Sequence, residues 1–235
     1  MPDIIFEALE DYAKVYDPPV PAKQCLPDWY KNQPLYAGNK KQIGQLGDDN
    51  YVNHTIRACM PVFDHITAGY VIVTPCDIII DTTNNQANFS WATKSMRHVD
   101  LHSPAQYENL PYDRRLYSSF ICKFNSGWGV KLPVGYSLIC QPPAWIPNAP
   151  FTALSGIVDA DKYHLPLNFP CLIKNDYQGI IPIGTPIVQL IPFKRESWSM
   201  STQTHKDYND LGIERLRRIM GHGYKRLFRT KKEWN

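Results

Sequence analysis

Proline spacing limits what the stretch from Lys131 to Trp198 can fold into. Short apolar runs alternate there with Pro, Gly and Asn-Asp punctuation. Because a proline removes a backbone donor and fixes φ, a long helix cannot pass through this stretch. Such a pattern predicts short strands joined by tight turns. We therefore expect a compact all-β unit here.

Similar strand patterns precede this unit, so we expect one β body over residues 51–198. Strands are predicted at Thr55 to Met60, at Gly69 to Ile80 and at Ala87 to Thr93, with a hairpin turn between the last two. Residues 1–50 are expected to form a proline-rich N-terminal arm and a polar loop. Residues 199–235 are expected to form a basic amphipathic helix or tail.

Composition excludes several classes of protein. With 235 residues, 43% hydrophobic and 20% charged, the chain has an ordinary globular composition. It has no apolar run long enough for a spanning helix, and its acidic start does not resemble a secretory signal, so we expect no membrane contact and no secretion. The six cysteines are scattered without a Cys-x-x-Cys pair, which disfavours zinc sites and predicts reduced, buried thiols.

The C-terminal segment carries most of the positive charge. Apolar residues from Ile213 to Phe228 recur at helical spacing. The predicted tail contacts are Arg215, Arg217, Arg218, Lys225, Arg226, Arg229, Lys231 and Lys232. Three hypotheses remain open: the tail packs on its own body, wraps a neighbouring subunit, or contacts nucleic acid.

Two pairs of side chains are candidates for chemistry. Asp159 and Asp161 share a face of an extended segment, so they could bind a divalent cation or supply a base, or accept backbone bonds in a turn. His98 and His102 have i,i+4 spacing, but no third ligand is evident, so no metal site is predicted. His102 with Gln106 could line a pocket. Nucleophile-elbow, Walker and dinucleotide motifs are absent from the sequence.

Part of the β unit resembles a known superfamily. Three segments resemble elements of the trimeric dUTPase and dCTP deaminase superfamily and occur in the same order along the chain: Leu132 to Tyr136, Gly156 to Tyr163 and Gly184 to Leu190. The resemblance implies a mainly β fold, a distorted β-barrel of the β-clip type. It implies that Asp159 activates water and that Tyr163 stacks on a sugar. If the protein is a nucleotide enzyme or binder, its site would use Asp161 and Gln189 as well, and Mg²⁺ could take part.

The sequence departs from that superfamily where phosphate should bind. Lys162 displaces the tyrosine by one position, which turns its ring to the opposite face. The strand ending at Tyr136 should be followed by a Pro-Arg-Ser element, whereas residues 141–147 contain neither a cation nor a hydroxyl. A triphosphate needs Arg, Lys, a metal ion or a nest of amides. We therefore do not expect an enzyme, although Lys194 and Arg195 could supply the missing charge to a neighbouring subunit.

A second resemblance covers nearly the whole chain. The segments Val20 to Tyr30, Cys59 to Tyr70 and Ile191 to Glu196 resemble an uncharacterised family found in tailed phages of cyanobacteria and in some proteobacteria. This resemblance implies a bacteriophage setting, in the host cytoplasm or the virion, and specifies no reaction.

The sequence thus favours a non-enzymatic viral β-barrel protein, without a cofactor, that acts as a structural or accessory assembly component. The expected partners are copies of itself, most simply in a homotrimer, and other virion proteins. One alternative is a nucleotide-binding or nucleotide-hydrolysing enzyme of the dUTPase type. A second is weak nucleic-acid contact through the basic tail.

Overall fold

The chain divides into two compact units, each described separately here. The computed structural model describes residues 2–46, 49–94, 96–144, 146, 149–204 and 223–234. Unit 1 consists of Met1–Cys25 and Gly69–Arg195, and unit 2 of Leu26–Ala68 and Glu196–Asn235. Unit 2 therefore joins two segments that lie far apart in the sequence, including the basic tail.

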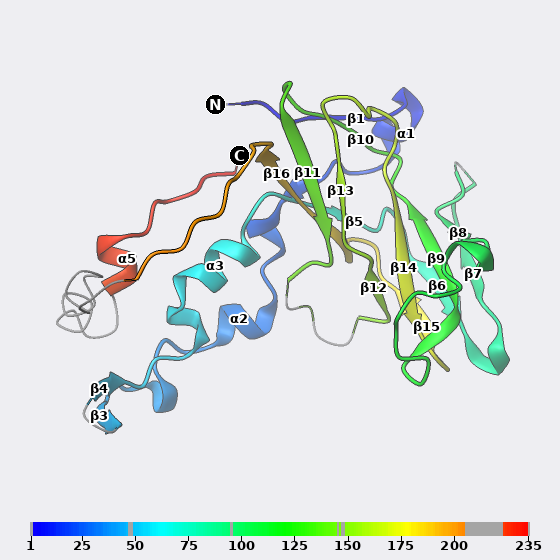
Figure 1. Cartoon of the computed structure of the whole chain (residues 1–235). Helices are drawn as coiled ribbons and strands as arrows, with labels where there is room; N and C mark the ends of the chain where they lie inside the picture. Colours follow the sequence, from blue (N-terminus) through cyan, green and yellow to red (C-terminus); the bar gives the residue numbers. More distant parts are fainter. Residues whose placement is uncertain are drawn as a thin grey trace. The chain divides into compact units, whose positions relative to one another are not determined.

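Unit 1 is built from antiparallel sheets (Figure 1). The largest has the order β13-β11-β16-β5-β2, with bounds Gly156–Val158, Tyr136–Gln141, Pro186–Lys194, Tyr70–Val73 and Val20–Pro21. A second has the order β12-β14-β9-β8, with bounds Phe151–Ala153, Asn168–Lys174, Tyr117–Asn125 and Val99–Leu101. A third has the order β15-β6-β7, with bounds Gln178–Ile181, Ile78–Asp81 and Asn88–Trp91. The prediction of a mainly β fold is confirmed.

These sheets share one apolar core, as in a distorted barrel. The alternation of side chains along β6 shows how the sequence sets it: Ile78 and Ile80 are fully buried, whereas Ile79 between them is half exposed. Buried members from all three sheets include Ile80, Leu138 and Phe124, whose ring lies 4.9 Å from that of Phe151, centroid to centroid. Burial of apolar side chains in this core is the main stabilising contribution to unit 1, and the central strands β5 and β16 are buried on both faces.

The first 25 residues belong to this β structure. Strand β1 (Ile5–Glu7) pairs with β10 (Gly129–Lys131), and β2 forms one edge of the largest sheet. Between them, helix α1 (Glu10–Val15) brings Tyr12 to the body, where its hydroxyl donates to the carbonyl of Ser126 at 2.6 Å. The predicted N-terminal arm is thus anchored in unit 1 by backbone pairing.

Unit 2 contains short helices and one hairpin. Its described elements are α2 (Asp28–Asn32), η2 (Ala37–Asn39), β3 (Ile43–Leu46), β4 (Asp49–Val52), η3 (Ile56–Ala58), α3 (Met60–Ile66) and α5 (Gly223–Leu227). The polar loop predicted before residue 50 instead contains the β3–β4 hairpin. At its base, the Asn53 side chain accepts from the amide of Gln42 and donates to the carbonyls of Ala37 and Lys40.

The strand predicted at Thr55 to Met60 was wrong, because local capping turns this segment helical. The Thr55 hydroxyl accepts from the amide of Arg57 at the start of η3, and Pro61 lies in the first turn of α3. Both features favour a helix start over a strand. The single strand predicted at Gly69 to Ile80 is divided into β5 and β6, which belong to different sheets, whereas β7 lies where the sequence predicted it. In the part of the chain that the structure describes, every helix is too short or too polar to cross a membrane.

Candidate functional site: an arginine clamp on two aspartates

Asp159 and Asp161 lie in the turn that follows β13, and both contact the same arginine. Arg195, directly after β16, lies with Nη1 3.1 Å from Asp159 Oδ1 and donates from Nη1 to Asp161 Oδ1 at 2.8 Å. A second bond joins Arg195 Nη2 to Asp161 Oδ2. The cation that the sequence suggested for a neighbouring subunit is therefore bound within its own chain.

Two residues at the start of β11 and just before it supply further partners of the two carboxylates. Ser137 Oγ donates to Asp159 Oδ1 at 2.7 Å, and the amide of Gly135 donates to Asp161 Oδ2 at 2.9 Å. Arg195 in turn donates its backbone amide to the carbonyl of Gly135 at 2.8 Å. These contacts tie the start of β11, the turn after β13 and the end of β16 together, and we call them the arginine clamp.

The clamp keeps both aspartates ionised. The hydrogen bonds from Arg195 and from the Gly135 amide hold the pKa of Asp161 well below its usual range. The Ser137 hydroxyl, with the charge of Arg195, also lowers the pKa of Asp159. A general base works best with a pKa near the operating pH, which requires a raised carboxyl pKa rather than a lowered one. The arrangement fits a structural ion pair better than a water-activating base.

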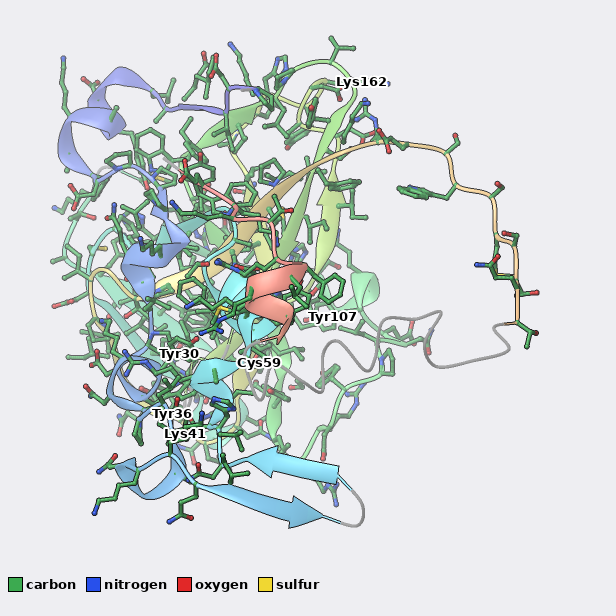
Figure 2. All side chains as sticks on the ribbon, turned by 90° about the vertical axis from the view of Figure 1, so that its left-hand side faces the viewer. Tyr30, Tyr36, Lys41, Cys59, Tyr107 and Lys162 are labelled. Atoms are coloured by element: carbon green, nitrogen blue, oxygen red, sulfur yellow. The ribbon has the colours of Figure 1, made fainter. Side chains whose placement is uncertain are left out.

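Tyr163 lies at the outer end of the same turn. The amides of Lys162 and Tyr163 both donate to the carbonyl of Asp159 at 2.9 Å, which closes the turn by backbone bonds. Lys162 and the Tyr163 ring are exposed, and Figure 2 labels Lys162 at the periphery of unit 1. The Asp161 carboxylate accepts a backbone amide, as the turn hypothesis expects, whereas the Asp159 carboxylate accepts from the Ser137 hydroxyl and pairs with Arg195.

Gln189 is not part of this cluster. It lies on β16 with only 1% of its surface exposed, and its Oε1 accepts from the amide of Ala144 at 3.3 Å. Its cross-strand partner is Gln141, four residues along β11 from Ser137, which corresponds to about 13 Å of extended chain. The structure therefore separates Gln189 from the aspartates with which the sequence grouped it.

His98 and His102 lie in different surroundings. His102 Nδ1 lies 2.7 Å from Gln106 Oε1, so this predicted pair is in contact. His98 is buried, with Nε2 3.0 Å from the hydroxyl of Thr93, and burial lowers its pKa. The intervening β8 is extended, so His98 and His102 do not share a helical face. Within the described ranges, no cluster of three or more His, Cys, Asp or Glu side chains could hold a metal ion.

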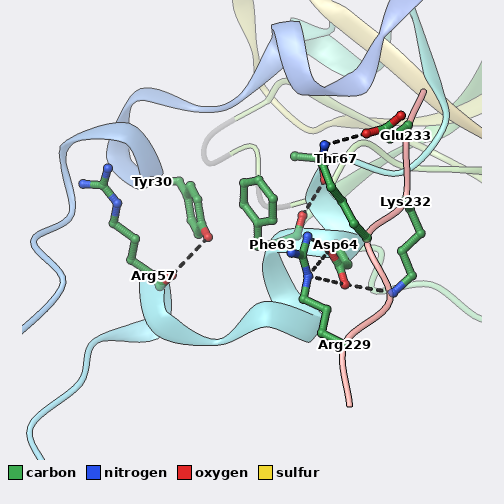
Figure 3. Close-up of polar contacts among 9 residues, drawn as sticks. Tyr30, Arg57, Phe63, Asp64, Thr67, Arg229, Lys232 and Glu233 are labelled. Atoms are coloured by element: carbon green, nitrogen blue, oxygen red, sulfur yellow. Dashed lines mark hydrogen bonds and ion pairs between the residues drawn. The ribbon is translucent and has the colours of Figure 1, made fainter. Parts of the chain in front are cut away.

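Residues 229–232 of the basic tail contact α3 within unit 2 (Figure 3). Arg229 Nη2 donates to Asp64 Oδ1 at 2.7 Å, and Lys232 Nζ donates to the other carboxylate oxygen at 2.9 Å. Lys231 pairs with Glu233. Lys225 and Arg226 lie on α5, whereas the predicted contacts Arg215, Arg217 and Arg218 fall outside the described residues.

Replacing Asp161 by Asn tests the clamp through the pH dependence of stability. Because the folded pKa of Asp161 lies below its ordinary 3.8, the clamp's contribution is complete above pH 3.8 and is lost as pH falls below it. We expect the wild-type urea midpoint to fall steeply in that acid range. Asp161→Asn should be less stable at neutral pH and should lose less on acidification. Parallel midpoint curves for the two proteins would contradict the clamp.

Comparison with known proteins gives partial structural likenesses. No family model matches the sequence, and no curated protein matches it. Among solved structures, the dUTPase of EIAV matches with a TM-score of 0.33 and 14% identity over 60% of this chain and 86% of that chain. A mutant dUTPase of phage phi11 of S. aureus matches at 0.31 and 11%, covering 60% of this chain and 85% of that one.

A further match is a mutant dUTPase of Staphylococcus bacteriophage 80alpha, solved with dUpNHpp. Its TM-score is 0.32 at 13% identity, and the match covers 60% of this chain and 77% of that one. Scores this low carry no conclusion about activity. What the chain's own structure establishes is a mainly β, antiparallel fold with its acidic turn closed by Arg195.

Proposed function

We propose that the protein is a non-catalytic β-barrel component of an assembly, of the structural or accessory kind found in bacteriophages, and that it works as a homo-oligomer. The observation that carries the first part is the arginine clamp. Asp159 and Asp161 are the carboxylates that a dUTPase-like activity would need, and both are bound to Arg195 with lowered pKa values. Their contacts are those of a structural joint.

An apolar row on the largest sheet supports self-association. Ile157, Ile139 and Ile191 are direct cross-strand partners on β13, β11 and β16, so their side chains share one face. Ile157 lies on the edge strand β13 and is 67% exposed, whereas Ile139 and Ile191 are partly buried. An exposed isoleucine on an edge strand, continued by two partly buried ones, is a surface that a second copy of the chain can cover.

Replacing Ile157 by Glu tests this interface. We expect the wild-type protein to form a single oligomer at micromolar concentration in light scattering coupled to size exclusion, most simply a trimer. Ile157→Glu should shift it to monomer, because a charge would be buried in the apolar contact. The control is Ile180→Glu, which changes an isoleucine of similar exposure, 55%, on another sheet. A monomeric wild-type protein, or equal effects of the two variants, would contradict the proposal.

A further inference from the structure

Unit 2 contains a cavity of its own. It has a volume of about 420 Å³, within the usual size of small-molecule sites. Residues of α2, η3, α3 and the tail line it, so the cavity depends on the fold-back of the chain's C-terminal segment. Its lining consists of Leu26, Tyr30, Lys31, Leu35, Arg57, Met60, Phe63, Lys225 and Arg229.

The charged residues of this lining are all cations. Lys31 pairs with the exposed Asp28, and Arg229 pairs with Asp64. Arg57 donates to two backbone carbonyls, those of Lys31 at 3.0 Å and Gln33 at 2.8 Å, and no described carboxylate pairs with it. Guanidinium and ammonium groups that no carboxylate neutralises attract an anion into a cavity. The oxygens of a phosphate group match the geometry of these donors well.

Asp64 offsets the charge of Arg229 but leaves Arg57 and Lys225 at the cavity without a described carboxylate partner. Its side chain is 11% exposed and accepts from both Arg229 and Lys232, so one carboxylate faces two cations. The hydrogen bonds from Arg229 hold the pKa of Asp64 below its usual range, which keeps it ionised and keeps Arg229 in place. Arg229 is therefore a positioned wall residue, while Lys225 on α5 is exposed at the cavity.

Planar groups form another part of the wall (Figure 3). The Tyr30 and Phe63 rings are stacked at 27°, with centroids 6.3 Å apart, and the Arg229 guanidinium carbon lies 5.7 Å from the Phe63 centroid. Tyr30 is only 4% exposed, and Phe63 lies between the Tyr30 ring and the Arg229 guanidinium. A flat ring in the cavity would therefore stack on that guanidinium, beside apolar Leu26 and Met60. Nucleobases stack on such aromatic and guanidinium groups without a sequence preference.

We propose that this cavity binds a nucleoside phosphate, with the phosphate at Lys225 and Arg57 and the base against the planar wall. The ligand is either a free nucleotide or one nucleotide of a single strand, since both offer the same chemistry. This inference stands apart from the proposed assembly role, because it concerns unit 2 alone. It also specifies which of the tail's cations meet the ligand.

The test compares three small probes on the full-length protein by calorimetry: dAMP, deoxyadenosine and inorganic phosphate. We expect dAMP to bind at least about tenfold more tightly than either fragment, because base and phosphate contacts add. Lys225→Gln should weaken dAMP binding about tenfold through loss of one charged contact. Arg226→Gln removes the same charge from the same helix without lining the cavity, and should leave dAMP binding nearly unchanged.

The source of the ligand follows from a competition experiment with a short single-stranded oligodeoxyadenylate. If it displaces dAMP, and its binding weakens with salt less steeply in Lys225→Gln than in wild type, the ligand is a strand. If it fails to compete, the cavity takes free nucleotides. Binding of dAMP no tighter than phosphate, or equal losses in Lys225→Gln and Arg226→Gln, would overturn the proposal. Circular dichroism of both variants serves as the control that they remain folded.

Discussion

Replacing Gly69 by Ala is expected to destabilise unit 1 by more than about 4 kcal/mol, which is at the far end of single-residue effects. Gly69 precedes β5 with a φ of +66°, a conformation that residues with a Cβ rarely adopt. An added Cβ would overlap the carbonyl oxygen of Leu190 on β16, and that oxygen is backbone that cannot move aside. This overlap would push β5 away from β16 and break their pairing in the middle of the largest sheet. Urea unfolding monitored by circular dichroism measures the change.

Gly156→Ala is the control for this prediction. Gly156 lies on β13 of the same sheet, and a Cβ there would meet no atom within 4 Å. We expect a change within about 0.5 kcal/mol of wild type, as at other open surface positions. If Gly69→Ala proved as mild as Gly156→Ala, the close approach of β5 and β16 would be contradicted.

Replacing Phe124 by Ala is expected to cost about 3–5 kcal/mol, the range measured for truncating a buried aromatic ring. Phe124 on β9 is 1% exposed and faces Val99 and Phe169 across its two neighbouring strands. It also packs on Phe151 of β12. Its removal would leave a cavity that rigid strands on several sides cannot fill.

Val134→Ala serves as the matched truncation, because Val134 is 91% exposed at the turn before β11. Its effect should stay within about 0.5 kcal/mol. A double-mutant cycle with Phe151→Ala should show coupling, since the two rings are in contact. Additive losses in that cycle would show that Phe124 and Phe151 do not share one core.

The strands of unit 1 could be predicted because their signals are local. Alternation at Ile78, Ile79 and Ile80 and the turn residues that follow are readable within a few positions of the sequence. The helical start at Thr55 and Pro61 also has a local signal, in a capping hydroxyl followed by proline. The mostly apolar residues from Ile56 to Met60 favour a strand instead, and the structure shows that the helix signal prevails.

The arginine clamp could be predicted only in part. The Asp159 and Asp161 pattern identified the turn, but Arg195 is 34 residues from Asp161 in sequence, and only the pairing of β11 with β16 brings it back. Sequence alone therefore left open whether that cation acts within its own chain or on a neighbour. Nothing near either residue encodes the choice.

The cavity of unit 2 had even less signal in the sequence. Asp64 and Arg229 are 165 residues apart, and each looks like an ordinary surface charge on its own. The tail was recognised as basic and amphipathic, but its partner on α3 was not. Contacts of this kind follow from the fold-back of the chain and have no local pattern.

The most direct test of the arginine clamp as a structural joint is phosphate and pyrophosphate release from dUTP and the four standard dNTPs with Mg²⁺ at millimolar concentration. Because Arg195 binds both Asp159 and Asp161, the wild-type protein is predicted to release no more than a protein-free blank. Release by wild type that is lost in Asp159→Asn would contradict this, and would make Asp159 a catalytic carboxylate.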